Sequence, residues 1–107
     1  MAFTGDEGKM VDAVTAQQWI DNYAKSVGPN ATKAHFVGFR RISELMGQGN
    51  AIGVRIYYAN DDLGTNRLVI VAVSPEEKNI ARIDGSAADG LVLDDTWRCP
   101  PYCNIPG

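Results

Sequence analysis

The sequence predicts a small α+β domain in which one or two helices pack on a small, mainly antiparallel sheet with a central β-hairpin. Two apolar segments, at about 51–59 and 67–74, have the residue pattern of strands, and the segment between them has the composition of a turn. A third segment, near 16–27, has helical periodicity. The chain has 107 residues, which is the size of one domain with one core.

The helix at 16–27 is preceded by a capping-box pattern, in which Thr15 accepts a backbone N–H and Gln18 reaches back. Its apolar residues then fall on one stripe, which places Trp19 in the core. The stripe consists of Trp19, Ile20, Tyr23, Ala24 and Val27. Gly28 and Pro29 stop the helix.

The next segment, 34–39, is either a short strand or the start of a helix. Ile42, Leu45 and Met46 have helical spacing, which predicts a short helix near 39–47 that ends at the following glycines.

The hairpin is the clearest feature. Ile52, Val54, Ile56 and Tyr58 alternate with other residues along 51–59, which is typical of a half-buried strand. Residues 67–74 are apolar on both faces, so this strand should be central or covered on both sides. Residues 60–66 have turn chemistry, and the two strands should pair antiparallel.

Beyond the hairpin the pattern weakens. Ile80 and Ile83 fit either a third strand or a helical turn, and Leu91–Leu93 form a last short apolar segment. We expect a loose arm over 1–14, one domain over 15–95 and an irregular tail over 96–107, which holds three of the five prolines.

Composition excludes several classes of function. The net charge is −3, and no run of basic residues exists that could neutralise nucleic-acid phosphates. No apolar run approaches the ~20 residues that span a bilayer, so we expect no membrane partner. The first residues lack the basic and apolar regions of a signal peptide, which predicts a cytoplasmic protein unless a non-classical route exports it.

The two cysteines, Cys99 and Cys103, enclose two prolines and a tyrosine. They could form a structural pair, a metal site or a redox dithiol. A zinc site needs four ligands, or three and a water, so the thiols would have to recruit Asp94, Asp95 or a second chain. Redox pairs favour C-x-x-C at a helix start, and consecutive prolines disfavour such a helix.

Geometry narrows these alternatives. An extended polyproline segment would hold the two cysteine Cα atoms ~12 Å apart. A disulfide needs about 4.4–6.8 Å. The motif is therefore either a five-residue ring closed by a turn at Pro101 and Tyr102, or a stiff extended arm that keeps the thiols apart.

Other candidate sites are weak. His35 is the only histidine and has no acid near it in sequence, so we expect a structural role rather than a Cys–His pair. The glycine-rich segment 47–53 lies between a helix and a strand, the reverse of a phosphate loop. The pairs Asp61–Asp62 and Asp94–Asp95 are expected to be solvated loop acids.

The chain also resembles a set of small uncharacterised bacterial proteins. The resemblance rests on Gly53–Tyr58 (G-V-R-I-Y-Y), on the L-V-I-V-A-V strand that follows the turn, and on the terminal C-P-P-Y-C. It covers about residues 33–103, and the terminal motif is its specific part. It implies family membership and no known activity.

The sequence therefore predicts a non-catalytic structural or protein-interaction module, whose partner is another protein or a second copy of the chain. No cofactor is expected. The candidate contact residues are Tyr57, Trp97, Pro100, Pro101 and Tyr102. The alternative is a small thiol-based metal-binding or redox protein that uses Cys99 and Cys103.

Overall fold

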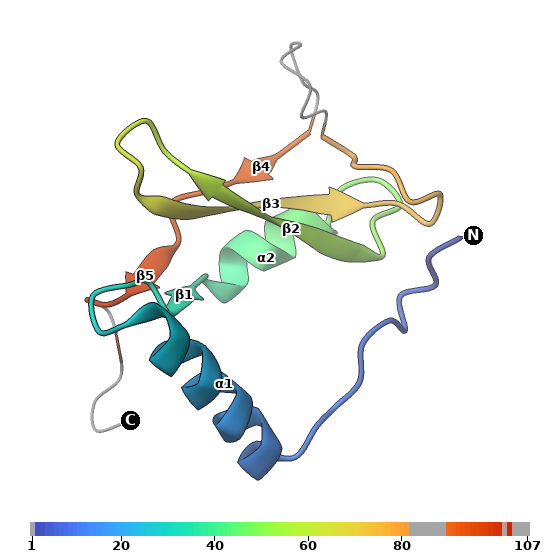
Figure 1. Cartoon of the computed structure of the whole chain (residues 1–107). Helices are drawn as coiled ribbons and strands as arrows, with labels where there is room; N and C mark the ends of the chain where they lie inside the picture. Colours follow the sequence, from blue (N-terminus) through green and yellow to red (C-terminus); the bar gives the residue numbers. More distant parts are fainter. Residues whose placement is uncertain (1, 82–89, 102, 104–107) are drawn as a thin grey trace. The chain divides into compact units, whose positions relative to one another are not determined.

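The computed structural model describes residues 2–81, 90–101 and 103, and confirms the predicted α+β class (Figure 1). The chain forms two compact units. Residues up to Glu7 and Val37–Thr96 make the first unit, and Gly8–Phe36 with the chain from Trp97 onward make the second. This grouping differs from the predicted arm, domain and tail, because strand pairing links segments that lie far apart in sequence.

The first unit is built on the predicted hairpin. Strand β2 (Gly53–Asn60) pairs antiparallel with β3 (Asn66–Val73) in a register that runs from Gly53 opposite Val73 to Asn60 opposite Asn66. A short strand, β4 (Val92–Leu93), pairs with the other side of β3, so the sheet order is β2-β3-β4. The central position of β3 explains why it is apolar on both faces.

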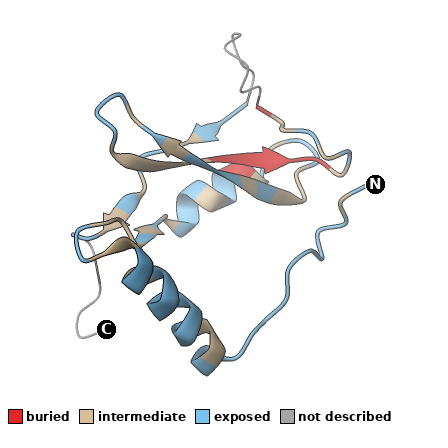
Figure 2. Ribbon diagram, in the orientation of Figure 1, coloured by how far each residue is buried: buried red, intermediate tan, exposed pale blue. Residues whose placement is uncertain are grey.

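One face of this sheet is covered by helix α2 (Phe39–Met46), which ends at Gly47 as the sequence predicts. Leu45 of the helix packs on Ile70 and Ala72 of β3, and these three residues are the centre of the core. The half-buried side chains around them are Val37, Ile42, Ala51, Leu68, Ile80 and Leu93. Figure 2 shows that the buried residues gather on β3 and α2.

The opposite face of the sheet has a polar cover. The Arg55 guanidinium of β2 donates a hydrogen bond to the Asn79 Oδ1 at 2.6 Å. Asn79 forms an isolated β-bridge with Val73, on the side of β3 that faces away from β2. The Arg55 side chain must therefore cross β3. Val71, which pairs with Arg55 and shares its face, is fully buried.

Residue 80 belongs with the sheet, since the Ile80 N–H donates to the Ala72 carbonyl. This contact favours the strand-like alternative for the segment, while Ile83 lies outside the described residues.

The second unit contains helix α1 (Ala13–Val27) and the two-stranded pair of β1 (Ala34–Phe36) with β5 (Trp97–Cys99). The pair corrects the expectation of an irregular tail, because the backbone of 97–99 finds hydrogen-bonding partners in 34–36. It also decides the open choice at 34–39 in favour of a strand.

Two predictions for α1 were wrong. The helix begins at Ala13 and its cap is Asp12, whose carboxylate accepts the Thr15 N–H at 2.8 Å. Thr15 therefore donates to the cap rather than being the cap. Trp19 is 60% exposed, and no residue of the helix is buried, so the apolar stripe does not form a core within this unit.

No helix in the described part of the chain has the length and apolar character needed to cross a membrane.

The burial of Val71 gives a test of the sheet. We expect Val71→Asp to abolish cooperative unfolding of the first unit, since burying a carboxylate costs several kcal/mol out of a total stability of roughly 5–15 kcal/mol, and the neighbouring Arg55 is already bonded to Asn79 and to the Glu77 carbonyl. Urea unfolding followed by circular dichroism measures this. The matched control is Val92→Asp, at the half-exposed neighbour of Val71 on β4, which should stay folded. A cooperatively folded Val71→Asp would contradict the observed packing.

Candidate interaction surface

The open edge of β2 is the main candidate site. In the sheet order β2 is outermost, and no described strand pairs with its outer side. At the end of the hairpin, the Asp61 N–H donates to the Thr65 carbonyl. From this pair onward, hydrogen-bonded and non-hydrogen-bonded residue pairs alternate along β2 and β3, as in any antiparallel pair of strands. Val54, Ile56 and Tyr58 are therefore among the β2 residues whose backbone N–H and C=O groups point away from β3.

The opposite side of β3 supports this assignment. Ala72, the register partner of Val54, uses its carbonyl to accept from Ile80 on the far side of the strand. The backbone groups of Val54 are thus left for the open edge. Within the described part of the chain, the edge offers donors and acceptors without a strand partner at every second residue, which is the arrangement that an added strand recognises.

The same three residues expose apolar side chains. Val54, Ile56 and Tyr58 are 37%, 51% and 89% exposed, although they share the sheet face of Ile70 and Ala72. The sequence predicts this alternating set as the buried side of the strand. The structure covers it only in part, because an eight-residue helix is about 12 Å long and cannot cover the whole face.

Tyr57 has a different role from the one predicted. It lies on the opposite face, and its hydroxyl accepts a hydrogen bond from the Asn79 Nδ2 at 2.8 Å. This bond and the nearby Arg55 lower the pKa of Tyr57. Asn79 thus holds Arg55 and Tyr57 together, and the neighbouring Tyr58 is the more exposed aromatic side chain. The alternation of side chains along a strand predicts that the two tyrosines project from opposite faces. It does not predict which of their hydroxyls is hydrogen-bonded by another side chain.

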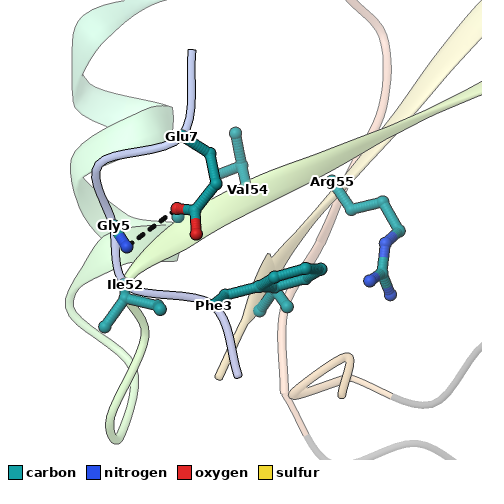
Figure 3. Close-up of a pocket in the computed structure, with 8 residues that line it drawn as sticks. Phe3, Gly5, Glu7, Ile52, Val54 and Arg55 are labelled. Atoms are coloured by element: carbon teal, nitrogen blue, oxygen red, sulfur yellow. Dashed lines mark hydrogen bonds between the residues drawn. The ribbon is translucent and has the colours of Figure 1, made fainter. Parts of the chain in front are cut away.

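A pocket of about 420 Å³ lies beside the start of β2 (Figure 3). Phe3 and Glu7 of the N-terminal arm line one side, and Ile52 and Val54 line the other. The complete lining is Phe3, Gly5, Glu7, Ile52, Gly53, Val54, Arg55 and Val73. The arm was predicted to be loose, so nothing in the sequence indicated this pocket.

Local contacts hold the arm in shape. The Glu7 carboxylate accepts the backbone N–H groups of Thr4 and Gly5, each at 2.8 Å, and these bonds lower its pKa. The Phe3 N–H donates to the Pro75 carbonyl, and the Phe3 ring lies 5.9 Å from the Arg55 guanidinium carbon, within cation–π range.

The hairpin loop is organised by Asp61. Its Oδ1 accepts the N–H groups of Leu63 and Thr65 at 2.9 Å each, and its Oδ2 accepts from the Arg67 Nε at 3.2 Å. Gly64 follows with a φ of 80°, the left-handed conformation that glycine adopts without strain. Asp61 is thus a structural acid rather than a merely solvated one.

The predicted tail residues are placed in the second unit. Trp97 is 57% exposed and pairs across β1 and β5 with Phe36, which is also exposed. Pro100 and Pro101 are exposed in the turn that follows β5, and Tyr102 lies outside the described residues. His35 lies in β1 opposite Arg98.

Cys99 and Cys103 are bonded to each other, with their Cα atoms 4.8 Å apart. Of the two geometries that the sequence allows, a closed five-residue ring and an extended arm, this distance fits the closed ring. A sulfur in a disulfide is not a thiolate, so neither is a metal ligand in this state. Within the described residues, no group of three or more potential His, Cys, Asp or Glu ligands comes together.

Comparisons with family models, with curated proteins and with solved structures found no match to this chain. The resemblance based on the hairpin and the terminal cysteine motif therefore remains a prediction.

The Asp61 contacts predict a defined pH dependence. The bond from Thr65, above all, lowers the pKa of Asp61 below its ordinary value of 3.8, so the ionised form stabilises the fold. This contribution is complete above the ordinary pKa and is lost as pH falls through the lowered one. Asp61→Asn should be less stable than the natural chain at pH 7, and the difference should shrink between about pH 5 and 2. Urea unfolding across this range tests the expectation, with Asp62→Asn as control. Parallel curves for Asp61→Asn and the natural chain would refute it.

The disulfide predicts a local effect in the second unit. Cys99 accepts the Lys33 N–H through its carbonyl at 2.7 Å. Closing a five-residue ring contributes about 2 kcal/mol in the loop-entropy model. The Cys99→Ser/Cys103→Ser variant should therefore exchange its Lys33 amide at least about tenfold faster, as measured by NMR. Cys103→Ser alone should have the same effect. Unchanged exchange in both variants would mean that the strand pair does not depend on the ring.

Proposed function

We propose that the protein is a non-catalytic structural module that self-associates, or binds another protein, through the exposed edge of β2. The observation that carries this proposal is the run of Val54, Ile56 and Tyr58, whose side chains are apolar and exposed and whose backbone groups point outward. Contiguous apolar surface beside unused strand donors and acceptors commonly marks a protein contact.

The composition of β2 supports the same role. Edge strands that remain unpaired usually carry proline, lysine, a bulge or an inward charge that blocks pairing. Gly53–Asn60 has no proline and no lysine, and its one charged residue is Arg55. Arg55 is engaged with Asn79 on the other face, so it does not guard the edge.

The second unit offers an additional contact. Trp97 and Phe36 form an exposed aromatic pair across β1 and β5, next to the exposed Pro100 and Pro101. Aromatic side chains supply large contact area at low entropic cost, and prolines reduce the ordering that docking requires. We assign this surface a secondary role, because its backbone edge is only three residues long.

The proposal includes no catalytic residue. Covalent catalysis by cysteine needs a thiolate within reach of a base. Cys99 is bonded to Cys103, and the sequence offers a single histidine, His35.

A thiol-based redox protein is the second candidate. The observation that favours it is the disulfide that joins Cys99 and Cys103 at an exposed proline turn. Thiol titration, together with metal analysis of protein purified without chelator, distinguishes this candidate from a purely structural disulfide.

The proposal predicts oligomers of a chain whose mass is 11.6 kDa. Light scattering over a concentration series should give a mass that is a multiple of this value. Ile56→Asp should weaken association about 100-fold or more, because it would bury a charge in the contact. The matched control is Leu63→Asp in the hairpin loop, where Leu63 is 92% exposed, and its association should be unchanged. A single-chain mass at every concentration would overturn self-association.

A further inference from the structure

The pocket beside the start of β2 lies on the sheet face opposite the apolar side chains of the proposed contact. Gly53, Arg55 and Val73 line it, and side-chain alternation sets these positions on the face away from Tyr58. Phe3 of the N-terminal arm lies over Arg55 on the same face. A molecule bound in this pocket would therefore be independent of self-association through the β2 edge.

Gly53 leaves the floor of the pocket open. A Cβ at Gly53 would meet no atom within 4 Å, and the φ of Gly53 lies outside the left-handed region. Neither crowding nor backbone conformation thus requires a glycine here. Glycine inside a strand often marks a place where a ligand or another backbone approaches closely. The missing side chain opens space above the strand that a bound molecule can occupy.

The strand is bulged at this point. Gly53 is the register partner of Val73, and the Ile52 N–H also donates to the Val73 carbonyl, at 3.0 Å. Two residues opposite one form a β-bulge, which re-aims side chains and is often found beside active sites. Ile52 accordingly lines the same pocket as Arg55, although strict alternation would set these two residues on opposite faces.

Two unlike charges line the pocket without pairing with each other. Arg55 is half-buried, and its hydrogen-bond acceptors in the described part of the chain are the Asn79 side chain and the Glu77 carbonyl, which are both neutral. The Glu7 carboxylate accepts N–H groups of its own arm, which lower its pKa. Among the described residues, no ion pair joins Arg55 or Glu7 to a side chain of opposite charge.

We propose that this pocket binds a small zwitterion with an apolar body, a free amino acid or a dipeptide, whose carboxylate bonds to Arg55 and whose ammonium bonds to Glu7. A guanidinium has five N–H donors in a fork that matches a carboxylate, and Asn79 and Glu77 use two of them. A carboxylate has about four acceptor sites, of which the arm uses three on Glu7, so one is left for an ammonium.

The rest of the pocket suits an apolar body. Phe3, Ile52 and Val73 supply its apolar lining. In the view of Figure 3, the Phe3 ring lies between the Glu7 carboxylate and the Arg55 side chain, so a body laid on the ring would have one charged group at each end. The volume of about 420 Å³ is at the lower end of the roughly 300–1,000 Å³ of ligand pockets, which suits a molecule of this size.

Ligand titrations followed by NMR of the isotope-labelled natural chain test the two charged groups. L-leucine and the dipeptide leucyl-alanine are the probes, and the tighter one, which distinguishes the two sources of the zwitterion, should give saturable shifts of the Gly53 and Val73 amides. Its N-acetylated form lacks the ammonium and its C-terminal amide lacks the carboxylate. Each should bind at least about tenfold more weakly, because a charge-assisted hydrogen bond is lost.

Two results of these titrations would overturn the proposal. One is equal binding of the zwitterion and its two analogues. The other is the absence of a saturable shift with either probe up to about 10 mM, which is ten times a weak dissociation constant of about 1 mM.

Glu7→Gln tests the ammonium site. The glutamine amide oxygen still accepts the arm N–H groups, so the arm should keep its shape, but the negative charge is removed. The variant should bind the tighter probe no better than the N-acetylated form. Asp62→Asn, at an exposed loop acid outside the pocket, is the matched control and should keep the difference between the two ligands. A preference for the ammonium that survives in Glu7→Gln would refute this assignment.

Gly53→Val tests the floor of the pocket. Valine suits a strand and its side chain would occupy the open space, so the variant should keep the urea midpoint of the natural chain and bind at least about tenfold more weakly. Ala59→Val, on the same face of β2 but outside the pocket, should bind as the natural chain does. If the valine variant fails to fold, Gly53→Ala makes the same test with a smaller side chain. A folded variant with undiminished binding would overturn the proposal.

Discussion

The antiparallel pairing of β2 with β3 is the interaction on which the first unit depends. It makes β3 a central strand, and this position allows four consecutive residues, Ile70–Val73, to lie with less than a tenth of their surface exposed. The backbone groups of a buried strand must all find partners, which β2 provides on one side, and β4 and the 79–80 segment provide on the other. The helix, the arm and the polar cover are then built around this strand.

As a consequence, one face of the sheet is larger than the helix that covers it. A single short helix protects Ile70 and Ala72 but leaves the apolar side chains of β2 half-exposed. The opposite face is closed differently, by Arg55 and Tyr57 that converge on Asn79 above the buried Val71. Polar side chains of the chain itself therefore cover the face on which Val71 lies. The other is incomplete at its outer edge, where we place the contact.

The elements with strong local patterns could be predicted from the sequence. Alternation over 51–59 and the two-sided apolar run over 67–74 identify the hairpin, and the spacing of Ile42, Leu45 and Met46 identifies α2. These signals are local, because periodicity reports which side of an element is apolar.

The remaining features depend on contacts between distant segments, which periodicity does not report. The strand at 97–99 forms only because 34–36 lies beside it, and a three-residue segment before two prolines has no pattern of its own. Tyr57 and Tyr58 differ because Asn79, 22 residues from Tyr57, reaches one of them. The pocket depends on an arm that is held by the Glu7 carboxylate and by Phe3, and short polar segments give no signal of such contacts.

The two edges of the sheet also bear on how an assembly would end. A contact between β2 of one copy and β4 of the next would leave a free β2 at one end and a free β4 at the other, and such head-to-tail contacts can grow without limit. β4 is only two residues long, so it offers little backbone for that contact. Among the described strands, a two-fold contact between two β2 strands would use both long edges at once and would leave the two short β4 edges free. A closed dimer would therefore satisfy the one long, unguarded edge of the β2-β3-β4 sheet, and the short β4 edge would limit further growth.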